Sequence, residues 1–122
     1  MRMKTITIIL TDGPYISEYA EIACKIAKAA LKKHHVNIFL YMDAVHIPKK
    51  GQNPAIFANA GELFRELARD GARIEACPRC ANARGYHDDS IGEDYLPGIR
   101  ITSLYNLAEM LEESDRVVAL SR

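Results

Sequence analysis

The chain has 122 residues, of which 48% are hydrophobic and 26% charged, so we expect one compact globular domain over residues 1–122. Its 16 basic residues balance 16 acidic ones, and bulk charge therefore does not indicate a nucleic-acid or membrane binder. The apolar stretches are strand-sized or interrupted by Lys and Glu, and no cleavage signal follows Met1. These features predict a cytoplasmic protein.

The first half of the chain alternates between strand-like and helix-like segments. Residues 5–10 are β-branched and apolar, as is typical of a strand covered on both faces. Residues 17–33 place apolar side chains at helical spacing, and Ser17 is the expected N-cap. Residues 36–42 should form a second buried strand, and a polar loop should follow over 43–53.

The second half continues the alternation. Asn53–Pro54 resembles a helix start, because Pro suits the first helical position, and Ile56 is expected on the apolar face of a helix that Gly71 ends. The remaining expected elements are a strand over 72–76, a short helix over 78–84, a polar loop over 86–98, a strand over 99–102, a helix capped by Ser103 with Leu104, Leu107, Ala108 and Leu111 facing the core, and a strand over 116–120.

Alternating strands and helices predict an α/β protein with a parallel sheet between helices, because parallel neighbours need crossover connections. Ligands of such sheets bind at the carboxyl ends of the strands. Asp12, the loop after Met42, Cys77 and Thr102–Ser103 should all lie at that edge. We expect Asp12 to act mainly as a turn residue.

The motif Cys77-Pro78-Arg79-Cys80 stands at a predicted strand-to-helix junction. Pro78 suits the first helical position, so the Cys77 sulfur should lie near the helix N-terminus, where the helix dipole favours a thiolate. Arg79 and Arg84 would add to this effect if they point inward. Cys80 lies almost one turn further on, within reach of Cys77, so it could resolve a mixed disulfide or share a carried sulfur.

Other readings of the cysteines are open. Cys77 and Cys80 could be small buried hydrophobes, as we expect Cys24 to be on its apolar helix face. A zinc site would use Cys77 and Cys80 with His87 or His46, but the second half-site of a structural zinc centre is missing. The turn over residues 11–15 lacks both the G-x-G-x-x-G pattern and the Walker pattern of nucleotide-binding proteins. We therefore expect neither a metal nor a cofactor.

The segment from Ala76-Cys77 through Arg84-Gly85, together with residues 101–104 and 115–118, resembles the DsrE/TusD/YchN-like family of sulfur-relay proteins. The resemblance covers nearly the whole chain. It implies that Cys77 accepts sulfur as a persulfide from a donor protein and passes it to an acceptor thiol. Cys80 would be auxiliary in this sulfurtransferase or carrier role, and Arg84 would support the anion.

The family resemblance also implies a five-stranded, three-layer α/β/α domain that forms a homotrimer or hexamer, or a hetero-oligomer with paralogues. The pathway would be tRNA thiolation or sulfur oxidation or reduction, without direct contact to nucleic acid or membrane. Cys80 departs from the single-cysteine carriers, since it could attack the persulfide and release sulfide. The alternatives are a C-x-x-C dithiol oxidoreductase and a non-catalytic subunit of a relay complex.

Overall fold

The computed structural model describes residues 2–87 and 94–122, so part of the predicted 86–98 loop lies outside the described residues. Strands and helices alternate in it, as the sequence predicts. In chain order the elements are β1 (Thr5–Leu10), α1 (Tyr19–Leu31), β2 (His35–Leu40), the 3-10 helix η1 (Met42–His46), α2 (Ala60–Arg69), β3 (Arg73–Ala76), α3 (Pro78–Ala83), β4 (Ile99–Ile101), α4 (Leu104–Glu113) and β5 (Arg116–Leu120).

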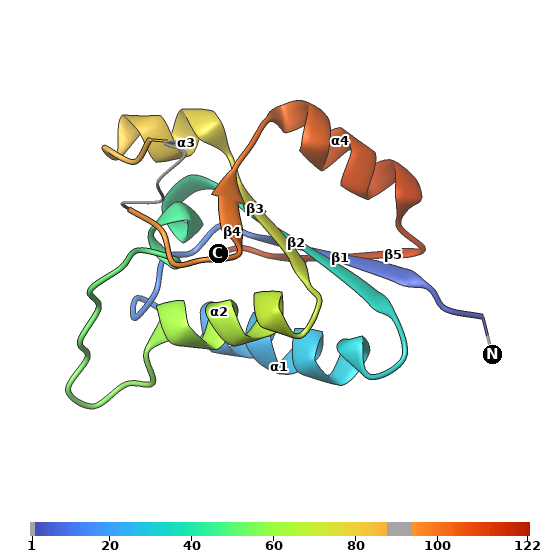
Figure 1. Ribbon diagram of the computed structural model, residues 1–122, viewed down its shortest axis with the longest axis horizontal. Helices are drawn as coiled ribbons and strands as arrows, with labels where there is room; N and C mark the ends of the chain where they lie inside the picture. The colour runs from blue at the N-terminus through green and yellow to red at the C-terminus, as the bar shows by residue number, and fades with distance from the viewer. Residues whose placement is uncertain (1, 88–93) are drawn as a thin grey trace.

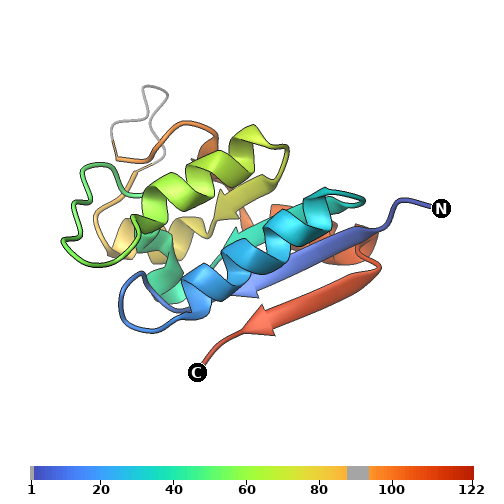
Figure 2. The same ribbon diagram turned by 90° about the horizontal axis from the view of Figure 1, so that it is seen from below.

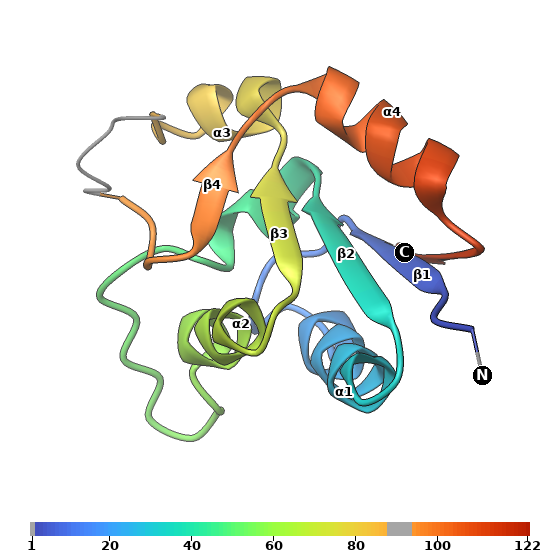
Figure 3. The same ribbon diagram turned by 45° about the vertical axis from the view of Figure 1, so that its right-hand side comes forward.

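The five strands form one sheet in the order β4-β3-β2-β1-β5, and every neighbouring pair is parallel. Helices α1 and α2 cover one face, and α3 and α4 lie on the other (Figures 1 and 3). The predicted three-layer α/β/α architecture around a parallel five-stranded sheet is therefore confirmed. Within the described residues, no helix combines the length and apolar character that a membrane span requires.

The face of the sheet under α1 and α2 is apolar. Ile8, Ile38 and Ile74 lie in one row across three strands and are almost wholly buried. Helix α2 adds Phe64 and Leu67, both without solvent exposure, whereas α1 packs through small residues and Cys24. Burial of such side chains contributes about 1.5–3 kcal/mol each and is the main stabilisation of this layer.

The face under α4 is polar at its centre. Asn37 donates one hydrogen bond to Thr7 Oγ1 at 3.2 Å and another to Glu113 Oε1 at 2.9 Å, and the Thr7 hydroxyl also bonds Ser114. In the described part of the chain, no buried side-chain nitrogen or oxygen lacks a partner. The layer is therefore held by satisfied hydrogen bonds, which is the condition for burying polar groups at low cost.

Two expectations about helix α2 are wrong. The helix begins at Ala60 instead of Pro54, because the Asn59 side chain accepts the N–H of Glu62 at 3.1 Å and so provides the N-cap. Ile56 consequently lies in the preceding loop and is 87% exposed.

The segment after the second strand also differs from the prediction. Strand β2 ends at Leu40, and the loop predicted over 43–53 starts with the 3-10 helix η1.

Two further expectations need correction. Ser17 is not the N-cap of α1; that position is Glu18, and the Ser17 hydroxyl donates to Asp12 instead. Ser103 does cap α4, but Met110 is the core residue of that helix. Helix α4 lies over a polar part of the sheet, so most of its other apolar side chains point away from the sheet. Leu104, Ala108 and Leu111 are exposed, and Leu107 is half-buried.

Candidate active site

The candidate residues meet at the edge of the sheet where the strands end. Asp12 follows β1, η1 follows β2, Cys77 follows β3 and Thr102 follows β4. The strand arrows in Figure 1 all point towards the side that carries α3 and the loops after β1 and η1. The prediction that these segments share one edge is confirmed, as the parallel topology requires.

Cys77 is the junction between β3 and α3. Its backbone is extended, with φ −64° and ψ 126°, and it is the N-cap of a helix whose first residue is Pro78. Its N–H donates to Leu40 O at 2.9 Å, and its carbonyl accepts from Ala81 N at 3.0 Å. The backbone of Cys77 is thus held by a strand and a helix at once, and its side chain is only 1% exposed.

Cys80 lies in α3 next to Cys77, and both are free thiols. The Cys77 thiol lies close enough to act on the pKa of Cys80, which is 8% exposed. Burial raises the pKa of the Cys80 thiol, and its contact with Cys77 raises it further. The backbone N–H of Met42 and the charge of Arg84 act in the opposite direction on that pKa. Cys80 is therefore a thiol at neutral pH, placed beside the candidate nucleophile.

Arg84 points back across the cysteine helix. Its Nε donates to Asp43 Oδ1 at 2.8 Å, and its Nη1 donates to the carbonyl of Cys80 at 3.0 Å. The hydrogen bond with Arg84 is the main reason that the pKa of Asp43 lies below its usual value. Arg84 thus joins η1 to α3, so its positive charge is shared with a carboxylate, whereas Arg79 is exposed.

Sequence reasoning did not identify an aromatic cluster behind α3. His46 Nδ1 and the Tyr86 hydroxyl are 2.6 Å apart, and the Tyr86 ring packs on Tyr95 with centroids 5.5 Å apart. Tyr95 donates to the carbonyl of Val45 at 2.5 Å. Burial raises the pKa of both tyrosines. In the sequence, only the spacing of Asp43 and His46, which are one turn apart in η1, could have pointed to His46 as part of such a cluster.

Asp12 is more than a turn residue. It accepts the Ser17 hydroxyl at 2.6 Å and forms an ion pair with Arg122 at 2.9 Å, although it is buried. This carboxylate joins the first loop to the segment that follows β5. The site edge therefore contains two ion pairs, Asp12–Arg122 and Asp43–Arg84, whose formal charges cancel.

Three other sequence candidates, Cys24, His46 and His87, contact other groups than the cysteine pair. Cys24 is buried under α1, and burial raises the pKa of its thiol, as expected for a core cysteine. His46 bonds Tyr86 instead of joining a metal set, and the described residues contain no group of three metal-ligating side chains. His87 is exposed, and its backbone N–H bonds Asp94.

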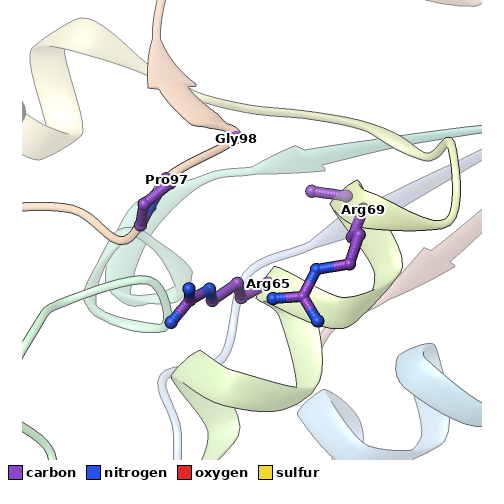
Figure 4. Close-up of a pocket in the computed structure, with 5 residues that line it drawn as sticks. Arg65, Arg69, Pro97 and Gly98 are labelled. Carbon is purple, nitrogen blue, oxygen red and sulfur yellow. The ribbon is translucent and has the colours of Figure 1, made fainter.

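A hollow of about 280 Å³ lies at the opposite end of β4, where that strand begins. Arg65 and Arg69 of α2 line it together with Pro97 and Gly98 (Figure 4). Arg65 also faces Glu62 at 3.7 Å. This hollow is separate from the cysteine edge, and the sequence did not single it out.

The structure is thus a doubly wound α/β/α domain with an all-parallel sheet and a buried cysteine pair at the carboxyl edge of that sheet. The model of the DsrE/DsrF-like family matches residues 4–120, so the chain belongs to that family. The predicted family resemblance is confirmed.

Individual relatives extend over nearly the full length. The uncharacterized protein MK0008 of Methanopyrus kandleri is 36% identical over 95% of this chain and 93% of its own. A protein of Allochromatium vinosum named as a candidate sulfurtransferase, DsrE, is 29% identical over 89% of this chain and 92% of its own. The crystal structure of the Escherichia coli YchN protein superposes with a TM-score of 0.83 at 24% identity, covering 97% of this chain and all of that one, which supports the fold.

Proposed function

We propose that this protein is a sulfur carrier that accepts sulfur as a persulfide on Cys77 and transfers it to an acceptor thiol. The observation that carries the proposal is the place of Cys77, at the end of β3 and the start of α3, in a member of the DsrE/DsrF-like family. The relative named as a candidate sulfurtransferase supports the same chemistry.

The transfer step is balanced without an oxidant. The Cys77 thiolate attacks the outer sulfur of a donor persulfide, a new S–S bond forms, and the electron pair of the broken S–S bond leaves on the donor thiolate. An acceptor thiolate then repeats the attack on the outer sulfur of Cys77. Since Cys77 is 1% exposed in the single chain, the donor reaches it only after α3 or η1 moves.

The assembly and the setting are part of the proposal. We infer that the chain works in the cytoplasm as a homotrimer or hexamer, or with paralogues, and exchanges sulfur with donor and acceptor proteins in tRNA thiolation or inorganic sulfur metabolism. The unpaired outer edge of β5 and the exposed Val117 are compatible with contacts between subunits.

Intact-protein mass spectrometry tests the carrier. Wild type, Cys77→Ser, Cys80→Ser and Cys24→Ser are incubated with inorganic polysulfide and measured before and after reductant. We expect reductant-labile added sulfur in every protein except Cys77→Ser, and Cys24→Ser serves as the matched control. Sulfur that still loads onto Cys77→Ser contradicts the assignment.

A dithiol oxidoreductase is the second candidate, favoured by the position of Cys77 at the N-cap of α3 and of Cys80 in the first turn of that helix. In that case the wild type forms an internal disulfide and loses two hydrogens instead of gaining sulfur. The same spectra separate the two functions. Cys80→Ser and Cys80→Ala both remove the second thiol, but Ser keeps a hydrogen-bond donor beside Cys77 and Ala does not. Comparing the two variants therefore separates the redox role of the Cys80 thiol from its role as a hydrogen-bond donor.

A further inference from the structure

A hollow lined by apolar and acidic side chains lies between the loop after β1, the start of α1 and the loop before α2. It encloses about 250 Å³. Ile16 and Phe57 are 58% and 53% exposed, and the Tyr15 ring packs against Phe57 with centroids 5.8 Å apart. Exposed apolar side chains that gather in one place mark interaction sites more often than isolated ones do. We call this surface the Tyr15–Phe57 hollow.

The hollow is built by defined contacts. Tyr15 has a left-handed backbone, with φ 70°, and its hydroxyl donates to Gln52 at 2.6 Å while accepting the N–H of Ala60 at 3.2 Å. The tyrosine therefore ties the first loop to the start of α2. A non-glycine residue at positive φ is strained and persists only where its surroundings hold it.

The hollow belongs to the same end of the sheet as the cysteines. Gly13, two residues before Tyr15, packs so closely on η1 that a Cβ there would lie 3.2 Å from the Asp43 carbonyl. Asp43 in turn pairs with Arg84 after the cysteine helix. Figures 1 and 2 both show the two loops at the end of the sheet where the strands point. A protein docked in the hollow therefore lies at the same end of the sheet as Cys77.

The charge of the hollow indicates which kind of partner protein it would bind. Glu18 and Glu21 line it, and among the described residues no Lys or Arg does. Apolar contact would supply most of the affinity, and the two carboxylates would favour a partner with basic residues beside its apolar side chain.

We propose that the Tyr15–Phe57 hollow docks the protein that exchanges sulfur with Cys77, through an aromatic or aliphatic side chain flanked by Lys or Arg. This inference rests on the proposed sulfur-carrier function and names the chemistry of its partner.

The probe is the peptide KKFLKK, compared with its charge-reversed form EEFLEE and with KKSSKK, in a titration followed by ¹⁵N NMR. We expect KKFLKK to shift the amide signals of residues 15–21 and 57–60, and the other two peptides to bind roughly tenfold more weakly. Equal binding of all three peptides, shifts confined to other surfaces, or no shift would overturn the proposal.

Three variants locate the binding. Ile16→Ser with Phe57→Ser should abolish the shifts, and Glu18→Gln with Glu21→Gln should weaken binding without abolishing it. Tyr105→Ser, which removes an 89% exposed aromatic ring from α4, is the matched control and should bind as wild type does. All the replaced side chains except the half-buried Glu21 are exposed, and circular dichroism checks that each variant is folded.

Two controls keep the outcomes distinct. Loading of Cys77 by inorganic polysulfide should be unchanged in Ile16→Ser with Phe57→Ser, because the small donor does not need the hollow. If the wild type itself takes up no sulfur, the sulfur-carrier function is refuted, whereas peptide binding in the hollow is judged separately. Sedimentation of the same variant tests the other occupant, a second copy of this chain. If the variant loses an oligomer that the wild type forms, the hollow is a subunit contact and the docking proposal is wrong.

Discussion

The two faces of the sheet are stabilised in different ways although the same five strands supply both. Under α1 and α2 the strands present Ile8, Ile38 and Ile74, and the helices cover them with apolar side chains. Under α4 they present Thr7, Asn37 and Glu75, and the helix binds through hydrogen bonds. Apolar burial does not depend on pH, whereas a layer held by a carboxylate does.

The largest expected effect is on the apolar face. Phe64→Ala removes a fully buried ring between α2 and the sheet and should lower the free energy of unfolding by about 3–5 kcal/mol in urea denaturation. Leu111→Ala on α4, where the side chain is 39% exposed, should cost clearly less. Equal losses would remove the distinction between the two faces.

The next effect is on the polar face. Glu75 accepts from Thr102 Oγ1 at 2.9 Å and from Asn106 Nδ2 at 2.8 Å, and it pairs with Arg73 Nε at 2.8 Å. Glu75→Ala leaves these donors without their acceptor and should cost about 1–3 kcal/mol. Glu112→Ala, at an exposed position of α4, should change stability by less than about 0.5 kcal/mol.

The same carboxylate predicts a pH dependence. Burial opposes ionisation of Glu75, but the hydrogen bonds from Arg73, Asn106 and Thr102 outweigh it and lower its pKa below the usual value of a glutamate. The unfolded chain therefore binds this proton more readily than the folded one. The stabilisation is complete above pH 4.5 and is lost as the pH falls through the lower, folded value.

Thermal melting from neutral pH downwards measures this loss. The wild type should lose more of its melting temperature below pH 4.5 than Glu75→Gln does, because Gln has no proton to bind. Parallel curves for the two proteins would show that Glu75 does not supply the acid sensitivity.

The smallest expected effects are at the two helix caps, one on each face. Asn59→Ala removes the cap of α2 and a further hydrogen bond to Gln52 O at 2.9 Å, whereas Ser103→Ala removes only local bonds to Asn106. Each should cost about 1 kcal/mol, with the larger loss at Asn59. A larger loss at Ser103 would mean that its cap also supports the Glu75 network.

The comparison also explains what could be predicted from the sequence. The strands were predictable because apolar or β-branched runs such as 5–10 signal burial directly. The orientation of α4 was not, because its apolar residues at 104 and 111 suggested a core face, and only the sheet beneath shows that Met110 is the buried contact. The start of α2 was misplaced because Asn53–Pro54 and Asn59 are both plausible starts, and tertiary contacts decide between them.

For the candidate site, the chain order was enough to place Cys77 and Cys80 at the sheet edge. The partners of Arg84 and His46 were not predictable, since Asp43 and Tyr86 lie 41 and 40 residues away from them in the chain. Such pairs depend on how η1 packs against α3, and no local pattern encodes that packing.

The order of the strands has a consequence for folding during synthesis on the ribosome. β1 is the first strand to be made, yet one of its neighbours is β5, the last element of the chain. During synthesis, β1 can pair with β2 early, but its other edge remains open until residues 116–120 emerge. An open edge of this kind pairs readily with other chains. The edge of β1 is thus protected only when β5 pairs with it, and Arg122, two residues after β5, then forms an ion pair with Asp12.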